Sequence, residues 1–555
     1  MPPLNRSDLT RRWLLVAGLL LLCTICFWWR LGYLGLIDPD EPFYAQSCRE
    51  MLQAHDWATP RIFGQPQFEK PIFIYWLSMA SFRGLGNHEF AARARAARFA
   101  SLLAFMTLIF GARAFNKRTA FLASLVLATS VEFFVSARMV LTDMLFAAFV
   151  CGSVFSLWLA SRTERPSGLW FVAACGMSGL AVLTKGPLGL ILPVFAILAV
   201  LLVRGNRFQP RPLPLAGGLV LFAAIAVPWY AIMLQKFGKA YFDAFFVHEN
   251  VERFFHAEHR SNNHVYYYLA VLAAGSLPWL PVLAAWMGGI QRRVMEDATS
   301  RFLATWGLLC LVFFTLAQSK LPSYVLFLFV PLALLIGRTL DLLLLAEGRG
   351  RLEKWAMAGL GLAQVVPFLV APRMLPYPGL AWPLGLVAVF LTIALVLQTR
   401  RISLSWIAAT GFSSIVLIVV CLAWAGPSVD AIVSARSLSR KVLAELRPSE
   451  TLMASPLLAR GVTYYTERPV TVLSNRAKPF YTSHPLPIVR GSEGLNRLLD
   501  EGGAALCVTS AHDWARLVPS LHPGTGVVLD TIGDKIVARV SAMRPKESST
   551  IATLH

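Results

Sequence analysis

Long apolar segments recur along most of this chain. An α-helix needs about 20 mainly apolar residues to cross the hydrocarbon core of a membrane, and roughly thirteen runs meet that requirement. They lie near residues 13–29, 96–112, 119–136, 144–161, 168–184, 187–203, 214–234, 266–290, 302–318, 323–340, 354–371, 379–398 and 402–425. The pattern predicts an all-α polytopic membrane domain over residues 1–426, with about thirteen transmembrane helices.

The pattern changes after residue 426. Apolar and polar residues mix there, with a helical periodicity over Ser434–Arg447 and strand-like runs over Val470–Leu473, Ala504–Thr509 and Val527–Val540. The Gly533-Asp534 pair inside the last run is typical of a hairpin turn. We therefore predict a small soluble α/β domain over residues 427–555.

Composition and charge agree with a membrane protein. The 555 residues are 56% hydrophobic and only 15% charged, and the mean hydropathy is +0.58. A formal net charge of +20 would suggest nucleic-acid binding in a soluble chain. Here the basic clusters fall in alternate loops, which is the pattern of the positive-inside rule. We expect these loops and the N-terminus to be cytoplasmic and the C-terminal domain to be periplasmic, with no nucleic-acid partner.

The first long outer connection, residues 30–95, opens with an acidic pair. Asp40 and Glu41 precede Pro42, which suits the first turn of a helix. Carboxylates at that position are favoured by the helix dipole, so the pair has a structural interpretation as a helix cap. A catalytic role is the alternative, since long loops on a rigid scaffold often carry functional sites.

Further along the same connection, Glu69 and Lys70 precede an aromatic-rich apolar run that contains Tyr75. The run is about 15 residues long, too short to span, so it predicts a helix in the outer membrane interface. One interpretation is a simple interfacial anchor. The other is the floor of a site for a lipid-linked substrate, with Lys70 beside a phosphate.

Three short outer turns carry further charged residues. Arg138 and Asp143 lie between the third and fourth apolar runs, Lys185 follows the fifth, and Lys320 and Tyr324 lie where the ninth ends and the tenth begins. A lone Asp at the start of a helix is often an N-cap, so Asp143 also has a structural alternative. Because these turns lie on the same side of the membrane as Asp40, we expect them to contribute to one site.

The second long outer connection, residues 235–265, is rich in histidine and acidic residues. His248, Glu252, His256 and Arg260 would share one face of a helix. Such a face could bind a metal, but no standard zinc spacing is present. We favour a polar interfacial helix here.

Taken together, these motifs resemble the GT-C superfamily of membrane glycosyltransferases that use polyprenyl-phosphate sugars. Within it, the chain is most similar to the bacterial aminoarabinose transferases, which move 4-amino-4-deoxy-L-arabinose from undecaprenyl phosphate to lipid A. The resemblance covers essentially the whole chain and is carried by five stretches: Asp40-Glu41, Phe68 to Leu77, Arg138 to Asp143, Leu183 to Pro187, and Ser319 to Tyr324.

The resemblance implies a GT-C fold with interfacial helices in the first outer loop and a catalytic cavity on the periplasmic side of the bacterial inner membrane. It implies direct, inverting transfer of the sugar, with carboxylates at an oxocarbenium-like centre and cations at the departing phosphate. It also implies a role in resistance to cationic antimicrobial peptides such as polymyxin. The expected catalytic residues are Asp40, Asp143 and Glu41, and the expected substrate-binding residues are Lys70, Tyr75, Arg138, Lys185, Arg253, Arg260, Lys320 and Tyr324.

A divalent cation, Zn²⁺ or Mg²⁺, is an optional cofactor in this hypothesis, with Asp40 and Glu69 as its ligands. The expected partners are the undecaprenyl-phosphate-linked sugar, lipid A and membrane lipids. Protein O-mannosyltransferases have the same acidic pair. An enzyme of that kind, which also uses a polyprenyl-phosphate sugar, is therefore the alternative within the superfamily. A lipid transporter or flippase, or an assembly protein with an outer interaction domain, is the alternative from another class.

Overall fold

The computed structural model describes residues 6–162, 168–205, 211–256, 262–346, 350–374, 381–400, 402–423, 426–476 and 486–541. The chain divides into two compact units. The first, here called the membrane unit, comprises Met1–Tyr33, Cys48–Arg61 and Pro66–Gly426. The second, here called the sheet unit, comprises Leu34–Ser47, Ile62–Gln65 and Pro427–His555. The sequence did not indicate that part of the first outer connection belongs with the C-terminal residues.

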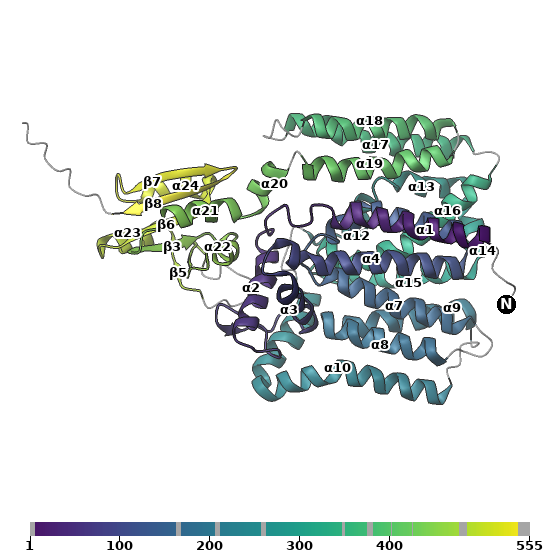
Figure 1. The fold of residues 1–555 in the computed structure, drawn as a ribbon, viewed down its shortest axis with the longest axis horizontal. Helices are drawn as coiled ribbons and strands as arrows, with labels where there is room; N and C mark the ends of the chain where they lie inside the picture. Colours follow the sequence, from purple (N-terminus) through teal and green to yellow (C-terminus); the bar gives the residue numbers. More distant parts are fainter. Residues whose placement is uncertain are drawn as a thin grey trace, which may run out of the picture. The chain divides into compact units, whose positions relative to one another are not determined.

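The membrane unit is built from helices that run alongside one another (Figure 1). Its first half contains α1 (Arg6–Cys23), the π-helical η1 (Thr24–Trp28), α3 (Phe73–Leu85), α4 (Glu89–Ala114), α5 (Lys117–Thr129), α6 (Val131–Ser136), α7 (Asp143–Ser161), α8 (Gly168–Lys185), α9 (Leu188–Arg204) and α10 (Pro212–Tyr241). Helix α2 (Asp40–Gln53) begins in the sheet unit and ends in the membrane unit, and strands β1 (Arg61–Ile62) and β2 (Gln65–Pro66) form a short hairpin.

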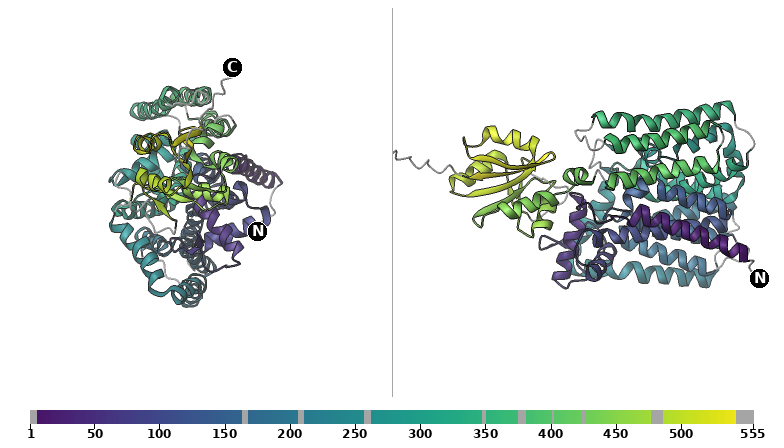
Figure 2. Two further views of the ribbon diagram at one scale, coloured as in Figure 1. Left: turned by 90° about the vertical axis from the view of Figure 1, so that its left-hand side faces the viewer. Right: turned by 45° about the horizontal axis from the view of Figure 1, so that its top comes forward.

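The second half of the membrane unit alternates short and long helices. It contains η3 (Phe242–Glu252), α11 (Arg253–Phe255), α12 (Tyr267–Gly275), α13 (Leu280–Ala284), η5 (Ala285–Gly288), α14 (Ile290–Glu296), α15 (Ala298–Leu316), η6 (Pro322–Leu328), α16 (Phe329–Leu345), α17 (Arg351–Met374), α18 (Ala381–Arg400) and α19 (Leu404–Ala423). The last three are drawn in green (Figures 1 and 2), and α18 packs against both α17 and α19.

Among the described residues, six helices are long and apolar enough to cross a membrane, or seven if the pair Tyr267–Gly275 and Leu280–Gly288, bent by 117°, counts as one span. The chain is therefore a multi-pass membrane protein. Four more apolar helices are shorter: Trp13–Trp28, Leu188–Arg204, Leu384–Leu397 and Leu404–Val420. The run predicted at 119–136 is broken, because α5 ends at Thr129 and Ser130 is extended before α6 begins.

Helix α7 lies at the centre of this unit, and 94% of the residues in its most apolar 18-residue stretch are buried. It packs against α4, α8 and α9. Phe155 of α7 stacks on Phe110 of α4 with ring centroids 4.0 Å apart, and Trp158 stacks on Phe302 of α15 at 4.4 Å. These ring pairs and close helix contacts fix the position of the N-terminal end of α7, where Asp143 lies.

The sheet unit has a six-stranded sheet in the order β5-β4-β3-β6-β8-β7. Its strands are β3 (Glu450–Ala454), β4 (Thr471–Leu473), β5 (Ile488–Val489), β6 (Ala504–Ser510), β7 (Gly526–Ile532) and β8 (Lys535–Ser541). Strands β3 to β6 are parallel, whereas β8 pairs antiparallel with both β6 and β7. The predicted α/β fold and the hairpin at Gly533-Asp534 are confirmed; β3 was not predicted.

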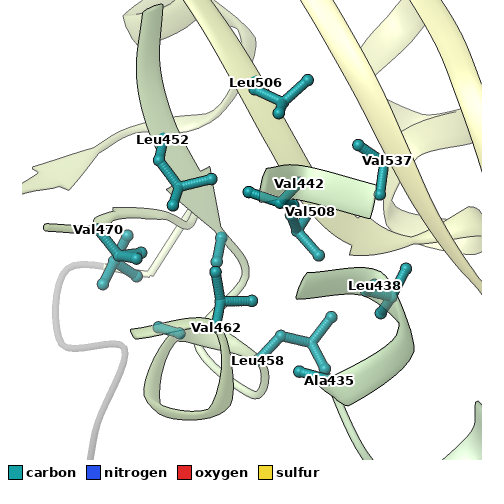
Figure 3. Packing of buried hydrophobic residues seen from close by; sticks show 13 residues of the cluster. Ala435, Leu438, Val442, Leu452, Leu458, Val462, Val470, Leu506, Val508 and Val537 are labelled. Atoms are coloured by element: carbon teal, nitrogen blue, oxygen red, sulfur yellow. The ribbon is translucent and has the colours of Figure 1, made fainter. Parts of the chain in front are cut away.

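Helices cover this sheet and give it two apolar clusters. They are α21 (Arg436–Glu445), α22 (Ala459–Thr466), α23 (Gly491–Asp500) and α24 (Ala511–Leu517), and α20 (Gly426–Val433) precedes them in the chain. One cluster joins Leu438 and Val462 to the strand residues Leu452 and Val508 (Figure 3). The other contains Leu495 and Trp514. Alternate residues of β6 enter the two clusters, as expected for a strand buried on both faces.

The segment 34–47 is fixed to the rest of the sheet unit through hydrogen bonds. Gly35 N donates to Asp430 Oδ1 at 2.5 Å, and Asp38 N donates to Val433 O at 2.9 Å. Asp38 Oδ2 in turn accepts from Ala435 N at 2.7 Å. These bonds place the start of α2, with its acidic pair, on the sheet unit.

Candidate active site

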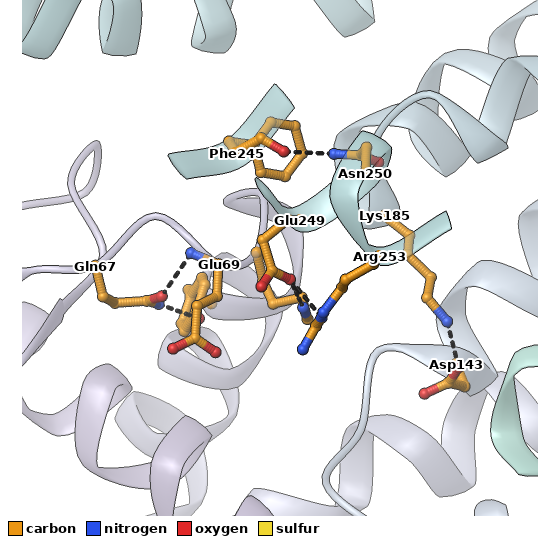
Figure 4. Close-up of polar contacts among 10 residues, drawn as sticks. Gln67, Glu69, Asp143, Lys185, Phe245, Glu249, Asn250 and Arg253 are labelled. Carbon is orange, nitrogen blue, oxygen red and sulfur yellow. Dashed lines mark hydrogen bonds and ion pairs between the residues drawn. The ribbon is translucent and has the colours of Figure 1, made fainter. Parts of the chain in front are cut away.

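Two outer connections of the membrane unit meet at one carboxylate, that of Glu249 in η3. Its Oε2 accepts from Lys70 Nζ at 2.7 Å and from Arg253 at 2.6 Å (Figure 4). The Glu249 side chain is only 4% exposed, whereas those of Lys70 and Arg253 are 19% and 21% exposed. Two partly exposed cations thus contact one buried carboxylate oxygen, and charged donors of this kind suit an anionic group.

A second ion pair joins two helices of the same unit. Lys185, the last residue of α8, places Nζ 2.5 Å from Oδ1 of Asp143, the first residue of α7 (Figure 4). Helix α7 begins at Asp143 and its N-cap is Thr142, which makes no side-chain capping bond. Asp143 is therefore not the N-cap. It lies in the first turn, where the helix dipole favours the carboxylate.

Tyr324 connects the two ion-paired groups. Lys185 Nζ lies 4.7 Å from the centroid of its ring. The Tyr324 hydroxyl also interacts electrostatically with Arg253, Lys70, Asp143 and Glu249. The predicted site residues Lys70, Asp143, Lys185, Arg253 and Tyr324 thus gather in one region of the membrane unit, and we call them, together with Glu249, the ion-pair cluster.

The turn after Lys185 is shaped for this arrangement. Gly186 has φ +78°, and a Cβ there would lie 2.9 Å from the ring of Phe245. Glycine allows this close approach and this backbone conformation. Asn250 donates to the carbonyl of Phe245 at 2.6 Å, and Ser319 N donates to the carbonyl of Arg253 at 3.2 Å. The second outer connection is thereby held against two of the outer turns.

The acidic pair separates into two environments within the sheet unit. Glu41 is fully buried, and its Oε2 accepts from Ile37 N at 2.7 Å. This bond stabilises the chain just before α2, so the structural interpretation fits Glu41. Asp40 is exposed at the first position of α2. Of the two, Asp40 is the one whose position allows contact with a substrate.

Asp38, which the sequence analysis did not single out, has the most perturbed carboxyl group of this segment. Although part of the residue is exposed, Oδ1 is buried without a hydrogen-bond partner. Burial raises the pKa of Asp38 to about 8, against the opposing effects of the Ala435 N–H and the nearby Lys535. Its bonds to Val433 and Ala435 indicate that it attaches the segment rather than acts on substrate.

Three predicted substrate-binding residues have structural contacts instead. Tyr75 is fully buried, and its hydroxyl accepts from Gln67. Arg138 donates to the carbonyls of Cys26, Phe27 and Trp29 and so caps the end of the first apolar helix. Lys320 is 2% exposed and donates to Asn263 Oδ1 and the carbonyl of Ala317. These contacts favour positioning roles for the three residues, and their contact with substrate stays a prediction.

Two other predicted positions need separate mention. Arg260 lies outside the described residues. The histidine-rich segment is helical only as far as Phe255, because His256 is extended. His248 and Glu252 do pair on that helix, at 2.7 Å. The helical face expected to continue to Arg260 therefore ends before His256.

The described residues do not fit a resident metal ion. No three His, Cys, Asp or Glu side chains among them gather closely enough to hold one. In the ion-pair cluster, Asp143 and Glu249 are each neutralised by cations. No step of the chemistry below is assigned to a metal.

Glu249 is the site residue that the sequence analysis missed. It lies in the histidine-rich connection, where the sequence pattern drew attention to other residues. Its i,i+4 spacing from Arg253 is the signal that could have identified half of the contact. The other half, to Lys70, joins residues 179 positions apart and has no local signature.

The comparisons with known proteins identify this bundle of apolar helices as a polytopic membrane glycosyltransferase. The family model for dolichyl-phosphate-mannose-protein mannosyltransferases matches residues 13–243. An undecaprenyl phosphate-alpha-4-amino-4-deoxy-L-arabinose arabinosyl transferase of Pseudomonas fluorescens (strain Pf0-1) is 32% identical over 495 residues, which cover 84% of this chain and 86% of the relative. The chain belongs to this arabinosyl transferase family, and the resemblance found in the sequence is confirmed.

Other relatives match over less of their length. The Erwinia tasmaniensis transferase of the same name is 33% identical over 312 residues, and the match covers 55% of each chain. Against the first few such relatives, the chain thus spans between about half and two thirds of their length. The crystal structure of ArnT from Cupriavidus metallidurans bound to undecaprenyl phosphate superimposes with a TM-score of 0.74 at 23% identity, over 96% of this chain and 98% of that one. The two proteins therefore share a fold.

Proposed function

We propose that this protein transfers 4-amino-4-deoxy-L-arabinose from undecaprenyl phosphate to a phosphate group of lipid A. The ion-pair cluster is the observation that carries the proposal. It offers two partly exposed cations, Lys70 and Arg253, that are held by a single buried carboxylate. The names of the relatives support the identity of the donor.

The cations serve the departing lipid phosphate. As the bond between the sugar and the phosphate breaks, negative charge grows on the phosphate oxygen, and positioned cations stabilise that charge more in the transition state than in the ground state. Lys70 and Arg253 are already held by Glu249 at 2.7 and 2.6 Å, so little reorganisation is needed at the moment of reaction. Tyr324 adds a hydroxyl donor beside them.

Carboxylates serve the sugar. Its anomeric carbon gains oxocarbenium character during transfer, which a nearby carboxylate stabilises. Asp40 is the first candidate because it is exposed, and Asp143 is the second. Asp143 forms an ion pair with Lys185. To contact substrate, its carboxylate must either leave this ion pair or bind the amino group of the sugar in addition to Lys185.

The reaction balances without a strong base. An oxygen of the acceptor phosphate forms a bond to the anomeric carbon of the sugar from the face opposite the donor. The bond from that carbon to the undecaprenyl phosphate oxygen breaks, and its electron pair stays with the departing phosphate. The acceptor is already anionic near neutral pH, so no side chain has to remove a proton. The configuration at the anomeric carbon is inverted.

The same proposal extends to placement in the cell. It puts about thirteen spans in the bacterial inner membrane, the N-terminus in the cytoplasm, and residues 427–555 in the periplasm as a separate domain. Basic clusters in alternate loops support this orientation. The activity would reduce the negative charge of lipid A and thereby confer resistance to polymyxin.

Reconstitution tests the proposal directly. The purified protein would be supplied with undecaprenyl phosphate-linked aminoarabinose and lipid A, and the lipid A product would be followed by chromatography. We expect one aminopentose to be transferred to lipid A. The family match to protein mannosyltransferases favours one rival, a protein acceptor with a hydroxyl group. Transfer to a polypeptide hydroxyl, with no transfer to lipid A, would replace our proposal with that rival.

A further inference from the structure

A cavity of about 410 Å³ lies within the sheet unit and shares no residue with the ion-pair cluster. Its volume is in the range of small-molecule sites. It is lined by Ser455, which follows β3, by Ser474, which follows β4, and by Ser510, which ends β6. The pocket therefore opens at the carboxyl ends of three neighbouring parallel strands.

The strand order places this pocket at a topological switch point. From β3 the chain moves to β4 and β5 on one side of the sheet, and then returns to form β6 on the other side of β3. Loops that leave β3 and β6 therefore diverge in opposite directions and leave a crevice between them. In open sheets with parallel strands, ligands bind in the crevice at this point.

Side chains of opposite charge meet at the pocket. Arg476 and Arg516 are exposed, and neither guanidinium group has a hydrogen-bond or ion-pair partner among the described residues. Lys535 also lines the pocket, but its Nζ already donates to the carbonyls of Ala431 and Ile432 at 3.2 and 2.6 Å. The two arginines are thus the cations available to a ligand, and guanidinium groups suit phosphate because they donate two parallel hydrogen bonds.

The remaining lining suits hydroxyl groups. Asp513 and Asp534 provide carboxylate acceptors, and Ser455, Ser474 and Thr509 provide hydroxyls. The lining residues that the structure describes include no aromatic side chain on which a nucleobase could stack. Cations for a phosphate, together with acceptors for hydroxyls, favour a phosphorylated sugar.

Glycine shapes one wall of the pocket. Gly491 has φ +52°, and a Cβ at this residue would lie 2.1 Å from Asn475 Oδ1. The loop after β4 therefore closes tightly on the start of α23. The N-terminus of α23 adds the positive end of a ten-residue helix to the same wall.

We propose that this pocket binds a phosphorylated sugar, with its phosphate on Arg476 and Arg516 and its hydroxyls on the carboxylates and serines. The ligand is either a soluble sugar phosphate or the phosphorylated sugar headgroup of a glycolipid. The inference does not depend on the proposed transferase activity, because the pocket and the ion-pair cluster belong to different units.

Calorimetric titration of the full-length protein in detergent tests this inference. The probes are N-acetylglucosamine 1-phosphate, neutral N-acetylglucosamine, and lipid A dispersed in the same detergent. We expect the sugar phosphate to bind at least about tenfold more tightly than the neutral sugar, and the double variant Arg476→Gln/Arg516→Gln to lose about tenfold or more in affinity. Arg468→Gln, an exposed arginine outside the pocket, is the matched control and should bind as the wild type does.

Because both pocket arginines are exposed, the double variant should unfold at the wild-type temperature, which separates lost binding from lost folding. Tighter binding of lipid A than of the soluble sugar phosphate, lost in the double variant, would assign the pocket to a glycolipid headgroup. Equal or weaker binding of lipid A would assign it to a soluble ligand. Absence of binding to both phosphorylated probes, or equal binding by the wild type and the double variant, would overturn the inference.

Discussion

Lys70 Nζ lies 2.7 Å from Glu249 Oε2 and so joins the two long outer connections of the membrane unit across 179 residues of sequence. Arg253 shares the same carboxylate oxygen at 2.6 Å. Two partly exposed cations thus share one buried acid, and charged donors of this kind suit an incoming phosphate. This relationship is the structural basis of the proposed donor site.

Replacing Lys70 should weaken use of the lipid-linked donor. A hydrogen bond between charged groups contributes about 1.5–3 kcal/mol, so Lys70→Ala should raise the apparent KM for the donor roughly 10- to 100-fold. Steady-state transfer assays at varied donor concentration measure this effect. Lys117→Ala, which removes an exposed lysine at the start of α5, is the matched control. An unchanged donor KM in Lys70→Ala would remove Lys70 from the phosphate site.

The Asp143–Lys185 pair should show coupling between stability and activity. Both side chains are mostly buried, at 9% and 13% exposure. Asp143→Asn alone leaves the Lys185 ammonium without its partner and should destabilise the protein by about 2–4 kcal/mol. The double variant Asp143→Asn/Lys185→Gln removes both charges and should recover part of that stability without recovering transfer. If the double variant regains wild-type transfer, the pair is structural only.

The attachment of the segment 34–47 should depend on pH through Asp38. Burial raises the pKa of Asp38 to about 8, whereas the unfolded value is 3.8. Between these values the folded state binds the additional proton, so its contribution to stability is complete below about pH 4 and is lost as the pH rises through about 8. Lys535 and Glu41 act on the same carboxyl group in opposite directions.

Asp38→Asn separates this effect from other titrating groups, because the amide oxygen can still accept from Ala435 N while carrying no charge. Thermal unfolding followed between about pH 5 and pH 9 should show that the wild type loses stability with rising pH more steeply than the variant. Parallel pH profiles for the two proteins would contradict the assignment.

Transfer should survive exhaustive chelation. The carboxylates of the ion-pair cluster are neutralised by lysine and arginine, and the described residues contain no group of three metal-binding side chains. The measurement is the transfer rate after prolonged dialysis against a strong chelator. Loss of activity that Zn²⁺ or Mg²⁺ restores would instead implicate Asp40 and Glu69 as ligands.

Local sequence patterns predicted the elements that depend on local physics. The β7–β8 hairpin followed from strand residues around Gly533-Asp534, and α3 followed from an apolar run too short to span. The sequence also selected Lys70, Asp143 and Lys185, because charged residues in connections on one side of the membrane were expected to contribute to one site.

Features that depend on distant contacts were not predictable in this way. The bond between Gly35 and Asp430 joins residues 395 positions apart, and no composition shift near residue 34 indicates that the chain leaves the membrane unit there. The burial of Tyr75 and Lys320 depends on tertiary packing, which the sequence alone does not display. The same holds for the partners of Arg138, which are backbone carbonyls of the first helix.

Mass spectrometry of lipid A from cells that carry either the wild-type protein or Asp40→Asn, with no other aminoarabinose transferase, tests the central claim most directly. Asn is nearly isosteric with Asp, and Asp40 is exposed, so the variant should accumulate in the membrane at the wild-type level. We expect wild-type lipid A to gain the mass of one aminopentose and lipid A from the variant to remain unmodified. Unmodified lipid A in wild-type cells that make the donor, or full modification by the well-folded variant, would contradict the account.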